Sequence, residues 1–176
     1  MNPNPRISKT MRSTATTLAA TVLALFTALA ASAGPEGGTV VRGTGSISQT
    51  NGGGNTVVTQ TSNRLAINWN SFNVGTTDTV QFVQPSSNSV ALNRIGSENG
   101  AVIQGSITSN GRVFLLSPAG ILFTETANIN VNSLFASTLD MTPDDFMAGN
   151  YRLSSNGTDG VIINRGLLQA DRKSVV

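Results

Sequence analysis

Apolar residues in the central part of the chain occur in short runs that are separated by turn-forming residues. Two of these runs, Val113–Leu116 and Ile121–Phe123, are separated by four residues. Those four, Ser117–Gly120, match a type I turn, because an acceptor side chain comes first, a proline with fixed φ second and a glycine last. Neither run is long enough to form a stable sheet by itself, so each must stack on equivalent strands elsewhere. The pattern predicts an all-β solenoid.

Similar strand patterns occur along most of the chain. Strands are also expected at Thr39–Arg42, Ser46–Ser48, Thr56–Thr61, Thr79–Gln84, Ser89–Ile95, Ile129–Leu134 and Val161–Gln169. Ile67 and Trp69 share one strand face, whereas Phe72 and Val74 share the next, so the alternation slips by one residue. This slip predicts a bulge or bend near Asn70–Ser71. Trp69 is most simply a core residue of the first coil, and a tryptophan that stacks on a ligand is the alternative.

Glycine repeatedly precedes an apolar run from Gly100 onward. Gly100 and Gly160 open similar blocks 60 residues apart, which predicts three coils of roughly 20 residues each. In the central strand, Phe114 and Leu116 point to the face opposite Val113 and Leu115, so both faces are apolar. Strands that are apolar on both faces are normally covered on both. We therefore expect a second layer, formed by a hairpin, over Phe114 and Leu116.

One segment interrupts the strand pattern. Thr142 is suited to cap a helix, Pro143 to occupy its first position, and Gly149 to end it. Asp144 and Asp145 would lie near the positive end of the helix dipole. We expect a single helical turn that is inserted outside the coils.

The first 33 residues have the organisation of a secretory signal peptide. A basic segment precedes an apolar run at about Leu18–Ala30, and Ala31 and Ala33 provide a small-residue cleavage site before Gly34. A membrane anchor is the alternative, but this run is shorter than the roughly 20 residues that a span needs. The sequence thus predicts a signal peptide at residues 1–33 and one domain at residues 34–176.

Charge and composition narrow the range of functions. Charged residues make up 11% of the chain, compared with roughly 25% in ordinary domains. Arg6, Lys9 and Arg12 precede the predicted cleavage site, which leaves eight basic and nine acidic residues and a net charge of −1. No basic patch indicates binding to nucleic acid.

The residues that most often carry enzyme chemistry are scarce. The chain has no Cys and no His, which excludes zinc sites built on those ligands, cysteine nucleophiles and Ser-His-Asp triads. Asp140, Asp144 and Asp145 form the one acidic cluster, and a role at the start of the helix explains two of them. We therefore predict no catalytic residue, no cofactor site and no metal site.

Six pieces of the sequence, in order, resemble the amino-terminal secretion domain of two-partner secretion exoproteins, also called the filamentous haemagglutinin or haemagglutination activity domain. The pieces are Ile67–Gly75, Val80–Pro85, Ala91–Ile95, Asn110–Phe123, Ala136–Asp140 and Asp144–Tyr151. The resemblance extends from about Gly37 to Ala170. The residues that match family positions and are expected to have structural roles are Asn68, Trp69, Phe72, Asn93, Arg94, Asn110 and Gly111.

The chain departs from the family pattern at its hallmark corner. The family motif Asn-Pro-Asn-Gly-Ile is present here as Ser117, Pro118, Ala119, Gly120 and Ile121. Ser keeps an acceptor side chain at the first turn position and Ala is allowed at the third, so the corner should be preserved. A second family motif, Asn-Pro-Asn-Leu, is missing from the expected domain. Family exoproteins are also much longer, so the chain resembles a carboxy-terminally truncated fragment.

The resemblance implies a right-handed parallel β-helix with an amino-terminal cap and extra-helical β-hairpins. It also implies a monomeric secretion domain that the general secretory machinery exports. The periplasmic domains of a dedicated outer-membrane β-barrel transporter would then recognise it and deliver it to the cell surface or the medium. Two alternatives are also compatible with the sequence: an adhesin module that binds its target directly, and a carbohydrate-active enzyme of the β-helix type.

Overall fold

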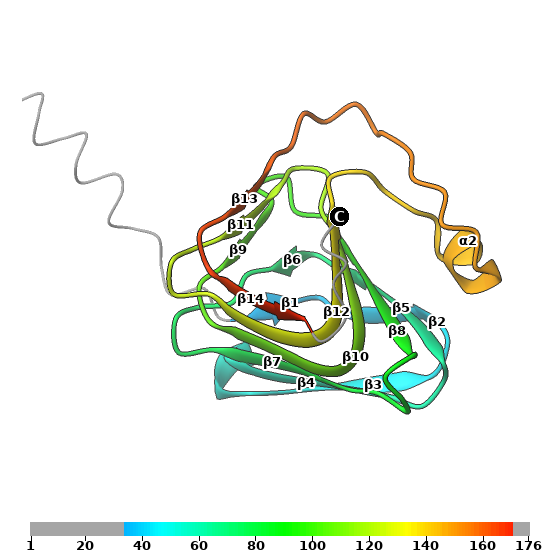
Figure 1. Ribbon diagram of the computed structural model, residues 1–176, viewed down its shortest axis with the longest axis horizontal. Coiled ribbons are helices and arrows are strands. Elements are labelled where there is room, and N and C mark those ends of the chain that lie inside the picture. Colours follow the sequence, from blue (N-terminus) through cyan, green and yellow to red (C-terminus); the bar gives the residue numbers. More distant parts are fainter. Residues whose placement is uncertain (1–33, 171–176) are drawn as a thin grey trace, which may run out of the picture. The chain divides into compact units, whose positions relative to one another are not determined.

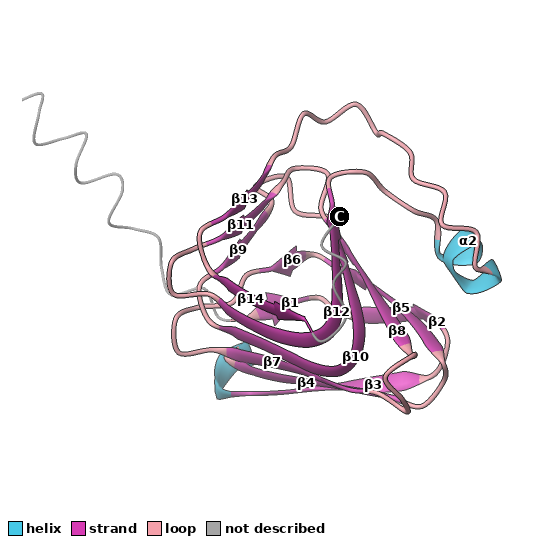
Figure 2. Cartoon of the chain, in the orientation of Figure 1, coloured by secondary structure: helices cyan, strands magenta, loops and turns pink. Residues whose placement is uncertain are grey.

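Strands account for most of residues 34–170, the part of the chain that the computed structural model describes (Figure 2). The predicted signal peptide, including Ala31 and Ala33, lies outside the described residues. The elements are β1 (Pro35–Glu36), β2 (Thr39–Arg42), β3 (Gly45–Thr50), the 3-10 helix η1 (Asn51–Gly53), β4 (Asn55–Gln60), β5 (Arg64–Trp69), β6 (Ser71–Phe72), β7 (Thr79–Val83), β8 (Val90–Ile95), β9 (Ala101–Ile103), β10 (Ser106–Leu116), β11 (Ile121–Phe123), β12 (Asn128–Ser137), α2 (Pro143–Ala148), β13 (Ile162–Asn164) and β14 (Leu167–Ala170).

The strands wind into a parallel β-helix with three faces (Figure 1). On the first face β4, β7, the first half of β10, the first half of β12 and β14 pair in parallel. On the second face β5, β8 and the second halves of β10 and β12 do the same. The third face consists of β9, β11 and β13. The predicted solenoid is therefore confirmed.

The coils differ in length, which the glycine spacing did not predict. Along the third face Ala101, Ile121 and Ile162 are register partners, so one coil advances 20 residues and the next 41. The prediction of three 20-residue coils between Gly100 and Gly160 is therefore wrong, because this stretch contains two coils. The second coil is longer since it includes α2 and the loops on either side of it.

Antiparallel strands cap the start of the solenoid, as the resemblance implied. The strands β1, β2 and β3 pair antiparallel with β6, β5 and β4, respectively. The bend expected near Asn70–Ser71 is also present, since β5 ends at Trp69 and β6 begins at Ser71. This cap satisfies edges that the first coil would otherwise leave unpaired.

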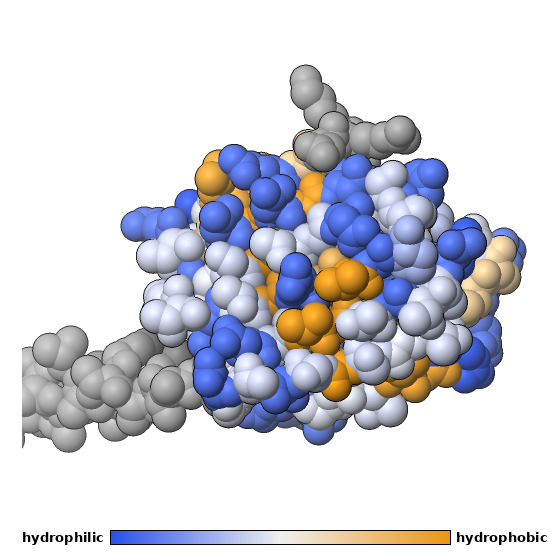
Figure 3. Space-filling model, turned by 90° about the horizontal axis from the view of Figure 1, so that it is seen from below, coloured by the Kyte–Doolittle hydropathy of each residue, from blue (hydrophilic) through white to orange (hydrophobic). Residues whose placement is uncertain are grey.

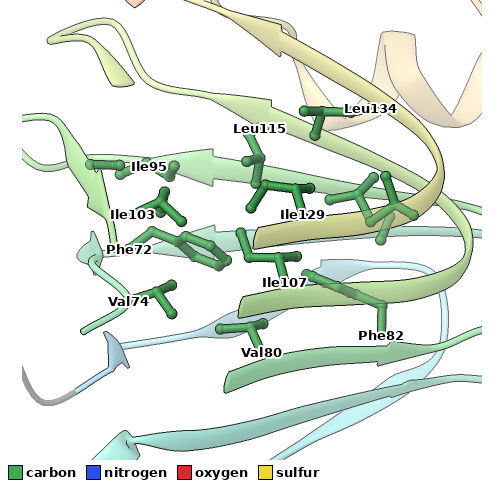
Figure 4. Close-up of a cluster of buried hydrophobic side chains, with 14 of the residues drawn as sticks. Phe72, Val74, Val80, Phe82, Ile95, Ile103, Ile107, Leu115, Ile129 and Leu134 are labelled. Carbon is green, nitrogen blue, oxygen red and sulfur yellow. The ribbon is translucent and has the colours of Figure 1, made fainter. Parts of the chain in front are cut away.

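The interior of the solenoid is filled by columns of apolar side chains, which we call the inner core. Val80, Ile107 and Ile129 are register partners on β7, β10 and β12, and their side chains lie above one another (Figure 4). Each is at most 1% exposed. Since each coil supplies a similar residue to the same position, burial is repeated along the stack. This repetition is the main source of stability that the sequence pattern encodes.

A second apolar cluster covers the outer side of the second face, and we call it the outer cluster. It is composed of Ala66, Val90, Leu92, Leu116, Met141 and Phe146, with Val41, Phe114, Phe135 and Met147 partly buried against it. Leu116 is fully buried, and the ring centroids of Phe114 and Phe146 are 6.1 Å apart. The predicted second layer is thus present. The expectation that it is a hairpin is wrong, because helix α2 and the residue Met141 before it form this layer.

Helix α2 has the ends that its sequence predicts. The Thr142 Oγ1 accepts a hydrogen bond of 3.1 Å from the Asp145 N–H, and Gly149 ends the helix with a φ of 79°. Phe146 is fully buried, so the helix is part of the packing, and not merely an insertion outside the coils. No helix within residues 34–170 is long enough and apolar enough to cross a membrane.

Candidate functional site

The family motif forms a tight corner between β10 and β11. The Gly120 N–H donates a hydrogen bond of 2.9 Å to the Ser117 carbonyl, which closes the turn. The φ of Ala119 is not positive, which fits the third position of a type I turn. A type II turn would need a positive φ there. Gly120 has a φ of 113°, and a Cβ atom there would lie 2.6 Å from the Val161 carbonyl oxygen. Both the backbone conformation and the close neighbour therefore require glycine.

The Ser117 side chain does not take the role expected from the turn. Its backbone N–H donates to the Ser137 carbonyl at 3.0 Å, which ties the corner to the next coil. Its Oγ is buried and has no hydrogen-bond partner within residues 34–170. The expectation that this side chain serves as an acceptor is therefore corrected, because backbone groups close the corner. A buried hydroxyl without a partner also costs stability.

Trp69 and Asn93 link three strands inside the solenoid. The Trp69 Nε1–H donates to the Asn93 Oδ1 at 3.0 Å, and the Asn93 Nδ2 donates to the Phe114 carbonyl at 3.1 Å. Trp69 is 2% exposed and packs edge-on against Phe72, with a centroid distance of 5.3 Å. The prediction of a core tryptophan is thus confirmed. The alternative of a ligand-stacking tryptophan is wrong, because no face of the ring is accessible.

A half-buried ion pair lies beside the corner. Arg94 on β8 donates from Nε to the Asp140 Oδ1 at 2.8 Å and from Nη2 to Oδ2 at 2.5 Å. Its Nη1 also donates to the Asn68 Oδ1 at 3.1 Å. Burial by itself would raise the pKa of Asp140, but the hydrogen bonds and positive charge of Arg94 outweigh it and hold that pKa below its ordinary value. The pKa of Arg94 is raised, mainly by the hydrogen bond with Asp140.

These residues surround a shallow hollow at the end of the second face. Its volume is about 360 Å³, and Asn68, Trp69, Arg94, Pro118 and Asp140 contribute to its lining. The structure therefore brings together several family positions that are far apart in the sequence. Within residues 34–170 no group of three or more His, Cys, Asp or Glu side chains is placed to hold a metal ion.

Asn110 and Gly111 lie elsewhere, where β10 bends from the first face to the second. The Asn110 side chain accepts from the Gln84 N–H at 2.8 Å and donates to the Gln84 carbonyl at 2.7 Å. A Cβ atom on Gly111 would collide with the Gln84 side chain. These two residues therefore hold the bend, and they are not part of the hollow at the Ser117–Gly120 corner.

Sequence reasoning missed the polar network inside this bend. The Gln84 Nε2 donates to the Gln60 Oε1 at 2.9 Å, and the Ser109 Oγ donates to the Gln84 Oε1 at 2.6 Å. Gln60 and Gln84 are both about 4% exposed. On the neighbouring parallel strands β4 and β7, Thr59 pairs with Val83, and Gln60 and Gln84 are the residues that follow them. No local signal marked this contact, because it depends on the register between the two strands.

The acidic cluster has structural partners. Asp140 pairs with Arg94, Asp144 pairs with Arg42 at 2.7 Å, and the Asp145 Oδ2 accepts a hydrogen bond of 2.8 Å from the Thr142 Oγ1. Each carboxylate thus accepts a hydrogen bond from a charged or hydroxyl donor, and these contacts fix α2 or the residues just before it.

Comparison with known proteins agrees with this architecture. The family model of the TPS secretion domain matches residues 31–175. A heme/hemopexin-binding protein of Haemophilus influenzae is 39% identical over 123 residues, which is 70% of this chain and 12% of that protein. A second Haemophilus influenzae protein of the same name is 36% identical over 62% of this chain and 12% of its own length. The chain therefore spans about one eighth of the length of these relatives.

A solved structure gives the same result for the fold. The crystal structure of the HMW1 secretion domain from Haemophilus influenzae superimposes with a TM-score of 0.71 and 34% sequence identity. The similarity covers 77% of this chain and 36% of that one. Together with the match over residues 31–175, this shows that the chain belongs to the family of two-partner secretion (TPS) domains.

Proposed function

We propose that the domain is a secretion signal that a dedicated outer-membrane β-barrel transporter recognises in the periplasm. The general secretory machinery would export the chain and remove residues 1–33. The transporter's periplasmic domains would then bind it and pass it to the cell surface or the medium. The observation that carries this proposal is the match of the TPS secretion domain over residues 31–175.

We further propose that the folded domain nucleates β-helix formation in the residues that follow it in longer exoproteins. The last coil supports this idea, because its apolar side chains are exposed where those of earlier coils are covered. Ile162 is 41% exposed and Leu168 is partly exposed, whereas their register partners in the preceding coil, Ile121 and Ile129, are 2% and 0% exposed. An additional parallel coil would cover these side chains and pair with the edges of β13 and β14.

An export assay tests the secretion role. The chain is expressed in a Gram-negative host with and without a two-partner secretion transporter, and its amount is measured in the periplasm and the medium. We expect it in the medium only when the transporter is present, with Gly34 as its first residue. Export that does not depend on the transporter would contradict the proposal.

Two substitutions at the corner extend this assay. Gly120→Val places a β-branched residue at a φ of 113° and against the Val161 carbonyl, so we expect misfolding and loss of export. Ser117→Asn restores the family residue, and we expect export at least equal to that of the wild type. Equal export of the two variants would show that the corner is not needed for secretion.

A further inference from the structure

The β3 strand has an unpaired edge that lacks the usual protection against strand addition. The nine-stranded sheet that forms the first and second faces has β2 at one edge and β3 at the other. Edge strands are normally protected by charges, prolines, bulges or a covering element. The β2 strand has such protection: its register with β5 shifts between Val40 and Arg42, and Arg42 pairs with Asp144 of α2.

The β3 strand has none of these features. Its six residues, Gly45–Thr50, pair with β4 without a break in register. They include no proline and no charge, and no charged residue occurs between Arg42 and Arg64. Seen from below, the side on which β3 and β4 lie in Figure 1, the surface is mostly polar or weakly polar with a few apolar groups (Figure 3). Charge would therefore not repel a strand that approaches this edge.

The hydrogen-bond pattern shows which backbone groups are available. The Thr61 N–H donates to the Thr44 carbonyl at 2.9 Å, so Thr44 and Thr61 form a hydrogen-bonded pair. In an antiparallel ladder such pairs alternate, and Gly45, Ile47 and Gln49 therefore direct their N–H and C=O groups away from β4. No strand within residues 34–170 pairs with β3 on that side.

Side chains hold β3 in position without blocking this edge. Ile47 packs against the inner core, and the Gln49 Nε2 donates to the Thr56 Oγ1 at 3.0 Å and to the Pro35 carbonyl at 2.5 Å. The side chains on the other face, Ser46, Ser48 and Thr50, are small and exposed. A strand that is already extended and fixed loses little conformational entropy when another strand pairs with it.

From these observations we infer that β3 is the docking edge for an extended segment of the transporter's periplasmic domains, which adds to the sheet as a further strand. This inference rests on the proposed function and names the surface involved. Strand addition uses main-chain hydrogen bonds for affinity, which suits an edge with free backbone groups and no charge. One six-residue edge is small compared with the roughly 1,200–2,000 Å² that stable interfaces bury. It therefore fits a transient export partner better than a permanent dimer of this chain.

Charge substitutions test the inference. The purified chain is titrated with the purified periplasmic domains of the transporter that supports its export. The variant Ser46→Lys/Ser48→Lys places two charges on exposed positions of β3. We expect its affinity to fall about tenfold, which corresponds to about 1.4 kcal/mol. The control Thr108→Lys/Asn130→Lys adds the same charge at exposed positions of β10 and β12, and its affinity should stay within about twofold of the wild type.

Cross-linking identifies the occupant of the edge. Because the chain contains no cysteine, Ser48→Cys gives a single attachment point for a photoactivated cross-linker, and Thr108→Cys gives a matched control. We expect Ser48→Cys, and not the control, to form an adduct with the periplasmic domains. Adducts at both positions, equal affinity of the two lysine variants, or a self-linked dimer through Ser48→Cys would overturn the assignment of β3 while the secretion role stands. Failure of the wild-type chain to bind the periplasmic domains at all would overturn both.

Discussion

The inner core and the outer cluster bury side chains of the same strand, but different parts of the chain complete them. On β10, Val113 and Leu115 point into the solenoid, whereas Phe114 and Leu116 point outward. Parallel strands complete the inner core, each with a residue at the same register position. The outer cluster depends on Met141 and Phe146, which belong to the segment between β12 and β13 that contains α2. We call it the α2 segment. The inner core is thus repeated with every coil, and the outer cluster is built once.

Polar contacts from three arginines attach the α2 segment to the second face. Arg94 pairs with Asp140, and both side chains are less than one third exposed, at 26% and 29%. The Arg64 Nη1 donates to the Phe146 carbonyl, and the Arg64 guanidinium lies 5.5 Å from the centre of the Tyr151 ring. Arg42 pairs with Asp144 in a more exposed position, with side chains 53% and 76% exposed. The outer layer is therefore held by few contacts, and we expect it to detach without unfolding of the coils.

The largest effect is expected in the inner core. Leu115→Ala removes a fully buried side chain from the stack, and the free energy of unfolding should fall by about 2–5 kcal/mol. Urea denaturation measures this loss, and hydrogen exchange should accelerate on all three faces because the coils unfold together. Leu139→Ala, at a position that is 37% exposed, is the control and should change stability by less than about 0.5 kcal/mol. Equal losses from the two variants would contradict the importance of the inner stack.

A smaller and more local effect is expected from Phe146→Ala. Phe146 is fully buried, but its loss can be relieved when α2 leaves the sheet. Global stability should therefore fall less than in Leu115→Ala, while α2 amides lose protection in hydrogen exchange. Amides of β8 and β10 should keep their protection. If these strands lose protection together with α2, the outer layer is not a separate unit.

The next effect concerns the half-buried ion pair. Asp140→Asn leaves Arg94 without its carboxylate partner, and the free energy of unfolding at neutral pH should fall by about 1–3 kcal/mol. Asp159→Asn is a matched control, since Asp159 is exposed and forms no ion pair within residues 34–170. Denaturation of the three proteins under identical conditions provides the comparison. Indistinguishable stabilities would show that the Arg94–Asp140 pair does not attach the α2 segment to the second face.

The same ion pair should give the protein a pH dependence. The folded-state pKa of Asp140 lies below its ordinary value of 3.8, so its contribution to stability is complete above that value. The contribution is lost as the pH falls through the folded-state pKa. The difference in stability between the wild type and Asp140→Asn should therefore be constant near neutral pH and shrink in acid below about 3.8. A difference that grows in acid would contradict the depressed pKa.

The smallest effect is expected from Asp144→Asn. The pair with Arg42 is exposed to solvent, and such pairs contribute about 0–1 kcal/mol. The thermal midpoint should shift slightly at low salt and not measurably at 1 M salt, where the screening length is about 3 Å. A loss as large as that of Asp140→Asn would mean that the exposed pair and the half-buried pair hold the start of α2 equally strongly.

Local features of this molecule were determined by the sequence. The turn at Ser117–Gly120 and the helix that starts at Thr142 and ends at Gly149 depend on residues within a few positions of each other. Alternation of apolar residues assigned Leu115 to one face and Leu116 to the other. Their signals are short-range, so neither the turn nor the strand faces needed knowledge of a partner. The bend after Trp69 belongs to the same class.

The tertiary structure decided which residues far apart in the sequence contact each other. The sequence showed that Leu116 is apolar, but nothing local could reveal that Met141 and Phe146 cover it. The 41-residue coil, the pairing of Arg94 with Asp140 and the buried contact between Gln60 and Gln84 also depend on register between strands that are 20 or more residues apart. The period of a strand specifies which face a residue occupies, but not which residue lies opposite it. That choice is made when the coils stack and the longest loop is placed, because burial then selects one register among several with the same alternation.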